Sequence, residues 1–324
     1  MTIKYNNVYL NSTYTIAGIN EKKGPLGNYF DKTYDDFYFG EKTFEEAESK
    51  IIIEAVNTLI KKETNPDLFI SGDLSNQIVA SNYAASKLRI PYLGIYNACA
   101  TSVEGLIIAA NFIEKNIINS CICGVSSHND SAEKQFRYPV EYGGVKPKTT
   151  TFTTTGACSA YLSNKKSKIK IESATIGEVV DMGIKNVYDM GSVMAPAASK
   201  TLYTHLIETN RDCTYYDLIL TGDLGKYGKD ILKILMKEDY NIELNNYDDS
   251  ACMIYDLEKQ DVYAGGSGPA CLPLVTYSYI LNKMKKKEIK KVLLLATGAL
   301  MSPTMVNLKL GIPAICHAIS LEVI

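Results

Sequence analysis

The sequence of 324 residues lacks several features that would narrow its function at once. It has no tryptophan, only three arginines and only three histidines, and its formal net charge is -2. Because nucleic-acid binding requires an excess of positive charge, we expect no nucleic-acid partner. No apolar run reaches the roughly 20 residues that cross a bilayer, so any membrane association is expected to be peripheral. Polar residues follow Lys4, so we expect no secretory signal peptide.

Metal-binding cysteine pairs are also absent. The eight cysteines are scattered along the chain, and none forms the two closely spaced pairs that hold zinc. Cys121 and Cys123 alternate along a predicted strand, so both thiols face the same way and are expected to pack in the core. This usage is typical of a reducing compartment. We therefore expect no metal held by the protein alone.

The composition that remains is that of an ordinary globular protein. Hydrophobic residues make up 46% and charged residues 22% of a chain long enough for two packed units. Lysines are concentrated in two runs, residues 165–170 and 283–291. We interpret both runs as solvated edges, with contact to an anionic membrane as the alternative.

One pattern occurs twice along the chain. Residues 67–74 reappear as residues 217–224, and each segment reads as a buried strand that ends in a Gly-Asp turn. In each half a turn, an apolar helix and a second buried strand follow, over residues 97–127 and 265–298. Two related βαβ units predict an α/β protein, in which ligands collect at the carboxyl ends of strands where the halves meet.

The repeat divides the chain into a first half, residues 1–170, and a second half, residues 171–324. A capping box of Thr43 and Glu46 opens a helix predicted over residues 44–61. Residues 133–155 are polar, aromatic and rich in turns, unlike the framework of either half. We interpret this segment as an insertion over the site.

Cys99 has the most informative position in the sequence. It lies between a hydrophobic strand predicted over residues 90–96 and an apolar helix predicted over residues 103–113. The N-terminus of a helix presents unsatisfied N–H groups and the positive end of the helix dipole, and both stabilise a thiolate or a bound anion. The position of Cys99 therefore suits a nucleophile or an anion site.

A catalytic Cys99 needs a base and donors for a developing oxyanion. His128 follows the strand after the Cys99 helix, and His317 lies in the last strand, predicted over residues 313–323. Each is a candidate for the site, with a structural role as the alternative. His205 is interpreted as a structural residue on the surface of a helix.

The second half has its own candidates. The counterpart of the Cys99 turn is a loop formed by Gly265, Gly266, Ser267 and Gly268, which offers N–H groups to an anion unless it is only a tight turn. Asp73 and Asp223 end the two Gly-Asp turns. Each is a candidate to contact a cation, or else stabilises its turn.

Several motifs follow one another in order along nearly the whole chain. They occupy residues 24–27 with 35–36, 71–77, 135–139 with 141–144, 194–198, 221–225, 265–268, 296–303, and 312–313 with 317–318. Together they resemble the stage V sporulation protein AD family, whose members have the thiolase fold. The segment around Arg137 and Gly143 is absent from ordinary thiolases, so the resemblance to this family is more specific than the resemblance to the fold.

The resemblance implies a thiolase-like fold, with the two halves in a five-layered α/β/α/β/α arrangement, and a homodimer. It also implies a role in the uptake of dipicolinic acid by developing bacterial spores. The implied partners are dipicolinic acid and the other proteins of the spore dipicolinate channel. The implied location is the spore or forespore, peripheral to the inner membrane through those proteins.

The sequence departs from the condensing enzymes of this fold at two places. Those enzymes keep a histidine where this chain has Thr221, Gly222 and Asp223, and an asparagine or histidine where it has the loop of Gly265 to Gly268. The resemblance therefore implies a thiolase pocket kept for binding, with catalysis lost. A thiolase-class acyltransferase that uses Cys99 and His317 is the alternative, and a purely structural subunit is a third interpretation.

Dipicolinate is a flat pyridine with two carboxylates, and it chelates calcium. Its carboxylates need hydrogen-bond donors, which the Cys99 helix and the glycine-rich loop supply, and positive charge, which Arg137, Lys146 and Lys148 supply. No cofactor is expected, apart from calcium as part of a bound chelate. Asp73 and Asp223 are then the candidates to contact the metal. The free acid and the chelate remain alternatives.

Overall fold

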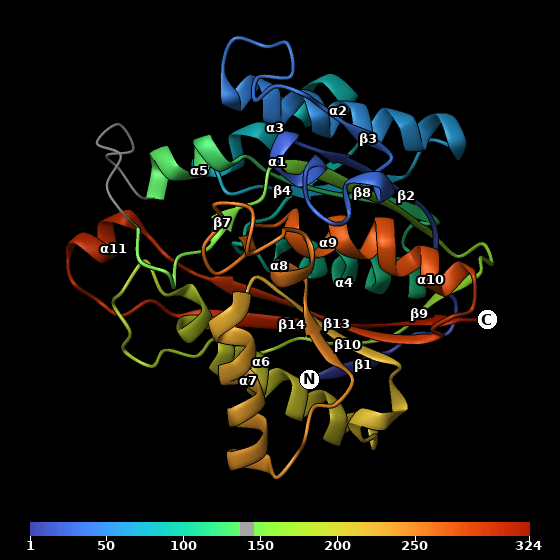
Figure 1. The fold of residues 1–324 in the computed structure, drawn as a ribbon. Coiled ribbons are helices and arrows are strands. Elements are labelled where there is room, and N and C mark those ends of the chain that lie inside the picture. The colour runs from blue at the N-terminus through green and yellow to red at the C-terminus, as the bar shows by residue number, and fades with distance from the viewer. Residues whose placement is uncertain (137–145) are drawn as a thin grey trace.

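Two sets of strands, each covered by helices on both faces, build the fold of the computed structural model (Figure 1). The structure describes residues 1–136 and 146–324. The strands are β1 (Thr2–Lys4), β2 (Tyr9–Ala17), β3 (Lys32–Thr33), β4 (Leu68–Gly72), β5 (Tyr92–Gly94), β6 (Ser120–Ser127), β7 (Phe152–Thr153), β8 (Gly156–Ser163), β9 (Ile169–Thr175), β10 (Leu218–Gly222), β11 (Tyr247–Asp249), β12 (Gly266–Ser267), β13 (Lys291–Ala299) and β14 (Ala314–Val323).

The helices alternate with these strands along the chain. They are α1 (Ile19–Lys22), η1 (Gly27–Tyr29), α2 (Phe44–Lys62), η2 (Asn76–Ile78), α3 (Val79–Leu88), α4 (Thr101–Glu114), α5 (Asn129–Phe136), α6 (Met190–Thr209), η4 (Cys213–Tyr215), α7 (Gly225–Tyr240), α8 (Ser250–Met253), α9 (Cys271–Val275), η5 (Thr276–Ile280), α10 (Leu281–Lys285) and α11 (Pro303–Asn307). No helix among the described residues is both long and apolar enough to span a membrane.

The layers follow from the strand order. The first half contributes the order β2-β8-β6-β4-β5 and the second the order β9-β14-β13-β10-β11, and the two sets join where β2 pairs with β9. Helix α4 and the run α9–η5–α10 pack between the sets, while α2 and α3 cover the outer face of one set and α6 and α7 that of the other (Figure 1). The predicted five-layered α/β/α/β/α arrangement is thus confirmed. The boundary placed between residues 170 and 171 falls within β9.

The internal repeat appears as two equivalent parallel strand pairs. In the first half β4 pairs with β6 from Leu68 with Cys121 onward, and in the second β10 pairs with β13 from Leu218 with Val292 onward. The aspartate before each first strand makes the same bonds. Asp67 accepts from the backbone N–H groups of residues 119 and 120, and Asp217 from those of residues 290 and 291. These carboxylates fix the start of the neighbouring strand in both halves.

Most predicted elements appear close to their expected bounds. Thr43 accepts a hydrogen bond from the Glu46 N–H group, so the predicted capping box opens α2. Cys121 and Cys123 are both buried, as predicted. The strand predicted over residues 90–96 shortens to β5, because it is an edge strand with Pro91 before it, and an edge strand has only one neighbour to pair with.

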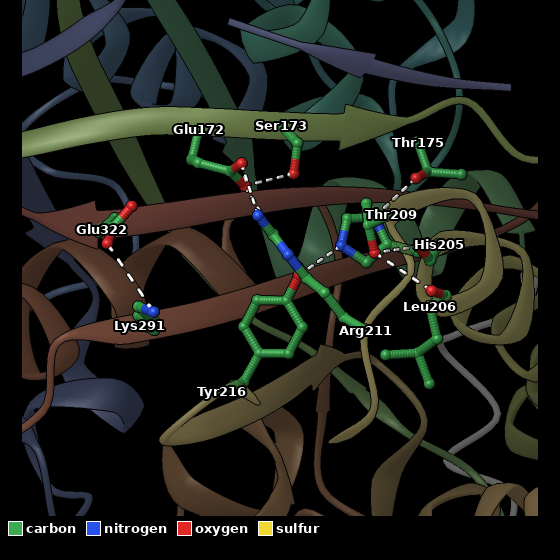
Figure 2. Close-up of polar contacts among 10 residues, drawn as sticks. All are labelled: Glu172, Ser173, Thr175, His205, Leu206, Thr209, Arg211, Tyr216, Lys291 and Glu322. Carbon is green, nitrogen blue, oxygen red and sulfur yellow. Dashed lines mark hydrogen bonds and ion pairs between the residues drawn. The ribbon is translucent and has the colours of Figure 1, made fainter. Parts of the chain in front are cut away.

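The prediction of His205 as a surface residue is wrong, because its side chain is fully buried. Figure 2 shows the ring between β9 and the segment that leads into β10. Its two nitrogens lie 2.7 Å from the Thr175 hydroxyl and 2.6 Å from the Tyr216 hydroxyl. Helix α6 is buried on more than one face, which an amphipathic pattern does not predict. Burial, followed by the charge of Arg211, lowers the pKa of His205 to about 4.

Candidate functional site

Cys99 lies on a tight turn just before α4. Ala98 adopts the left-handed conformation, with φ of +49°, which is unusual for a residue other than glycine. Thr101 holds the turn, because its hydroxyl accepts from the Asn97 N–H group at 2.9 Å and donates to the Ala98 carbonyl at 2.7 Å. The turn therefore fixes Cys99 at the helix N-terminus, as the sequence predicts.

Glycines allow the backbone of the second half to approach this turn closely. A Cβ atom at Gly298, near the end of β13, would lie 2.5 Å from the Asn97 carbonyl oxygen. In the first half, a Cβ atom at Gly72 would lie 2.1 Å from the Ile95 carbonyl oxygen. Both contacts exclude a side chain, and Gly298 is the one of the two that brings the second half against the Cys99 turn.

A cavity opens at this turn, and both halves contribute to its wall. Cys99 and Ser267 of the glycine-rich loop both line it. Thr151 and Thr153 add hydroxyl groups. The rest of the wall is largely apolar and comes from Leu74, Tyr96, Ala98, Ala132, Phe136, Met190, Met194, Ala299 and Met301. The cavity therefore combines a few hydrogen-bonding groups with largely apolar walls, a composition that is typical of small-molecule sites.

The glycine-rich loop forms a short strand pair with the segment between α5 and β8. Gly266 pairs with Phe152 and Ser267 with Thr153. Gly265 and Gly268 have φ of +119° and +102°, so both positions favour glycine. A Cβ atom at Gly266 would point away from the cavity, 2.9 Å from the Thr154 hydroxyl and 3.0 Å from the Cys271 sulfur. Ser267 is thus the residue whose side chain this loop directs at the cavity.

His317 of β14 contacts the Cys99 turn through Asn97. The Asn97 amide is 2.8 Å from its Nε2 atom, and the Gly177 N–H group donates to its Nδ1 atom at 3.2 Å. Because the Gly177 N–H group can only donate, a neutral ring carries its proton on Nε2, and the Asn97 amide must accept the hydrogen bond from that proton through its oxygen, whose position is interchangeable with that of the amide nitrogen. Burial lowers the pKa of His317 to about 4. The ring therefore supports the turn through Asn97 and is neutral at pH 7.

His128 is directed to the opposite side of its strand. Its Nε2 atom lies 2.8 Å from the Phe37 carbonyl oxygen, and its Nδ1 atom accepts from the Asp130 N–H group at 3.2 Å. The ring also packs against Phe39 and Phe44. Burial lowers its pKa. The structure does not bring His128 to the cavity, and the sequence gives no signal of this because contacts with Phe37 and Phe44, far away in the chain, hold the ring.

The two Gly-Asp turns differ in their hydrogen bonds. Asp73 accepts from the N–H groups of Ser75 and Ser81, both at 2.8 Å. Asp223 is fully buried with φ of +76°, and neither of its oxygens makes a hydrogen bond of ordinary geometry to a described residue. Burial and then the charge of Asp249 raise the pKa of Asp223, and the nearby Gly268 N–H group opposes this. Neither aspartate lines the cavity.

The expected positive groups at the cavity were Arg137, Lys146 and Lys148, but the charged residue that lines its described wall is acidic. Glu133 of α5 lines the wall with 3% of its surface exposed, and Lys146 donates to its carboxylate at 2.7 Å. Lys148 lines a separate groove beside α7. Arg137 lies outside the described residues. Among the described residues, no cluster of three or more histidine, cysteine or acidic side chains is arranged to hold a metal ion.

Sequence reasoning missed Glu133, Thr151, Thr153 and the methionines of the wall. The predicted insertion over residues 133–155 contains the first three, but composition does not say which of its side chains face inward. Met194 belongs to a motif of the resemblance, and α6 carries it to the cavity from the second half. The sequence does not show which faces of α6 are buried, so it does not show that Met194 reaches the cavity.

Solved structures identify the class of fold. The 3-oxoacyl-[acyl-carrier-protein] synthase III of Aquifex aeolicus matches with a TM-score of 0.55 and 14% identity, over 99% of each chain. Cerulenin-bound OleA of Xanthomonas campestris matches with a TM-score of 0.61 and 12% identity, over 99% of this chain and 98% of its own. At these identities the likeness concerns the fold alone, which is that of the thiolase and ketoacyl synthase class.

The family follows from the sequence comparisons. The profile of Stage V sporulation protein AD (SpoVAD) matches residues 1–322. The Stage V sporulation protein AD of Bacillus subtilis (strain 168) is 44% identical over 319 residues, which are 97% of this chain and 94% of the relative. The chain therefore belongs to the stage V sporulation protein AD family, and the predicted resemblance is confirmed.

Proposed function

We propose that this protein binds dipicolinate, as the free acid or as its calcium chelate, and serves dipicolinate uptake into the developing spore. The observation that carries the proposal is the cavity between the halves, which is lined by Cys99 at the N-terminus of α4 and by Ser267 of the glycine-rich loop. N–H groups and hydroxyls there suit carboxylate oxygens, and the apolar walls suit a flat ring. Membership of a sporulation family supports the same role.

The charge of the cavity wall affects whether free dipicolinate or its calcium chelate binds better. Glu133 is the charged side chain in the described part of the wall, and it forms an ion pair with Lys146. A dianion close to a carboxylate is repelled, whereas a chelate that carries calcium is not. Titration calorimetry with dipicolinate, with and without calcium, separates the two forms.

We further propose that the protein binds without catalysing acyl transfer. A base for the Cys99 thiol needs a nitrogen with a free lone pair, but the Nδ1 atom of His317 accepts from Gly177 and its Nε2 atom lies against Asn97. The position where condensing enzymes have a histidine holds Asp223, which is buried away from the cavity. Thiolysis of acetoacetyl-CoA that disappears in Cys99→Ala would support the acyltransferase alternative instead.

A homodimer and a position peripheral to the spore inner membrane complete the proposal. The open edge strand β5 exposes Leu93 by 40%, and the neighbouring helix α3 exposes Tyr83 by 65%. Pairing of two such edges would cover both. Light scattering is expected to give a dimer mass that falls to a monomer mass in Leu93→Lys. Membrane partners of the dipicolinate channel would hold the protein at the membrane.

The test of the proposal compares ligands by their carboxylates. The wild-type protein is expected to bind dipicolinate and to bind picolinate, which has one carboxylate, about 100-fold more weakly, because one charge-assisted set of hydrogen bonds is lost. Equal affinity for both compounds, or no binding of either, contradicts the proposal.

A further inference from the structure

The two lysine runs of the sequence come together at one edge of the fold. Strand β8 is antiparallel to β6 and ends opposite Ser120, so the loop after it lies at the amino end of β6. Lys165, Lys166 and Lys168 follow there, and the run before β13 lies at the amino end of that strand. Figure 1 shows α10 and the C-terminus on this side, with α5 and α11 on the other. The lysines are therefore at the end of the sheets opposite to the cavity.

A groove is lined by members of both runs, Lys166 and Lys168 from one and Lys285 from the other. Exposed lysines continue the charge on either side of this groove at Lys165, Lys286 and Lys290. None of these six forms an ion pair with a carboxylate of a residue that the structure describes. Glu63 lines the groove as well and Glu288 is exposed beside it, so the charge remains clearly positive. We call this surface the basic edge.

Two exposed isoleucines accompany the lysines. Ile324 is 56% exposed, and its N–H group donates to the Lys168 carbonyl at 3.0 Å. Ile117 is 66% exposed and lies two residues before Asn119, whose carbonyl accepts from the N–H group of Asn164, the neighbour of Lys165. Long basic side chains next to exposed apolar ones are typical of a surface that lies on a bilayer.

We propose that the basic edge binds the surface of an anionic lipid bilayer directly. The lysine ammonium groups would contact lipid phosphates, and Ile117 would enter the interfacial region. Three of the six lysines line the groove and three lie outside it, so the charge extends along the edge beyond one pocket, which suits an extended surface better than a single ligand or the carboxylates of a folded partner. In this orientation the cavity faces away from the bilayer.

The test is cosedimentation with vesicles of phosphatidylcholine alone and of phosphatidylcholine with one third phosphatidylglycerol. Wild-type protein is expected to bind only the anionic vesicles, and less as salt is added. Each lysine near an anionic membrane contributes about fivefold in partition, so Lys166→Gln with Lys168→Gln and Lys285→Gln should lower binding roughly 100-fold. These side chains are half-buried or exposed, and an unchanged circular dichroism spectrum and melting temperature will show that the variant folds.

The matched control removes the same charge from the groove beside α7, with Lys148→Gln, Lys226→Gln and Lys233→Gln. It is expected to bind as the wild-type protein does. The proposal is overturned if wild-type protein ignores anionic vesicles, or if both triple variants lose binding equally. Displacement from vesicles by millimolar glycerol phosphate would assign the groove to a soluble phosphate. Retention on immobilised polyglutamate at a salt concentration that abolishes vesicle binding would assign the edge to an acidic protein.

Discussion

The equivalent strands β4 and β10 each have an aspartate before their first residue and another after their last. The hydrogen bonds of the first aspartate are the same in both halves, and those of the second differ. Before the strand, Asp67 and Asp217 each accept hydrogen bonds from two backbone N–H groups of the neighbouring segment. After the strand, Asp73 is held by Ser75 and Ser81, whereas Asp223 is buried without such partners. The halves thus agree where the carboxylate supports the backbone and differ where the strand approaches the cavity.

The outer layers differ as well. Helix α2 of the first half covers its strands with apolar side chains, among them Ile51, Ile52 and Val56. The outer side of the second half contains a polar network in which Arg211 donates to both oxygens of Glu172 and to the Tyr216 hydroxyl (Figure 2). The second half therefore adds a charged network to an apolar cluster of its own, whereas the first half relies mainly on apolar contacts.

Breaking this network tests the difference between the outer layers. Arg211→Ala removes one partner of an ion pair whose side chains are each 14% exposed, and leaves the Glu172 carboxylate unpaired. We expect a loss of about 3 kcal/mol in the free energy of unfolding. Ile52→Val in α2 should cost only about 1 kcal/mol, because a single methyl group is removed. Urea denaturation measures both, and equal losses would contradict the contrast between the layers.

The Gly-Asp turns should respond to the same substitution with opposite signs. Asp73→Asn is expected to destabilise the protein by about 1–2 kcal/mol, because the amide accepts less strongly from the two N–H groups. Asp223→Asn is expected to stabilise it at pH 8 by about 1–2 kcal/mol, because a buried carboxyl group that the unfolded chain holds ionised at this pH is replaced by a neutral amide.

The pH dependence gives the second measurement on Asp223. Its pKa is raised in the native state, so the native state binds more protons than the unfolded state above the ordinary aspartate pKa. Wild-type stability should therefore fall as the pH rises from about 4 toward the raised pKa, and Asp223→Asn should flatten this fall. Thermal unfolding at several pH values checks it. A loss of stability at pH 8 in Asp223→Asn would show that the carboxylate has a partner that this account lacks.

The matching aspartates should give matching losses. Asp67→Ala and Asp217→Ala each remove two hydrogen bonds at exposed positions, and we expect about 1 kcal/mol for each. Urea denaturation of the two single variants and of the double variant is the measurement. Since the sites lie in different halves, the losses should add. A difference of more than about 1 kcal/mol between the two would show that the strands are not equivalent.

The smallest expected effect concerns the cavity wall, where the charged side chain comes from the first half. Glu133→Gln removes a carboxylate next to the proposed ligand and frees Lys146. Affinity for free dipicolinate should rise about threefold, and less at high salt. The calcium chelate should gain less or lose affinity. Calorimetric titration of both forms is the check, and weaker binding of the free acid would place the ligand away from Glu133.

Much of the fold could be predicted because the two halves repeat a recognisable sequence pattern. Two similar strands with Gly-Asp turns, each followed by a turn and an apolar helix, predict related halves, and the structure has them. The burial of His205 could not be predicted, since it depends on Thr175 and Tyr216 from other elements. The direction of His128 depends likewise on contacts with Phe37 and Phe44.

The sequence predicted where the turn and the loop of the candidate site lie, but not which of their side chains face the cavity. The position of Cys99 before a helix follows from the local pattern, and Ser267 from the repeat. Gly266 is an example of what could not be predicted. A Cβ atom there would point toward Thr154 and Cys271, and this direction depends on a strand pair with residues far away in the sequence. A substitution that fills the cavity from the second half therefore belongs at Ser267 rather than at Gly266.

The most direct measurement of the central claim fills the cavity from each half in turn and titrates dipicolinate by calorimetry. Cys99→Phe blocks it from the first half and Ser267→Phe from the second, while Ser49→Phe occupies the groove between α2 and α3 as a control. We predict one dipicolinate site per chain in the wild-type protein and in the control, and no binding in either cavity variant although both remain folded. Wild-type affinity in both cavity variants would contradict the claim that the halves form the dipicolinate site between them.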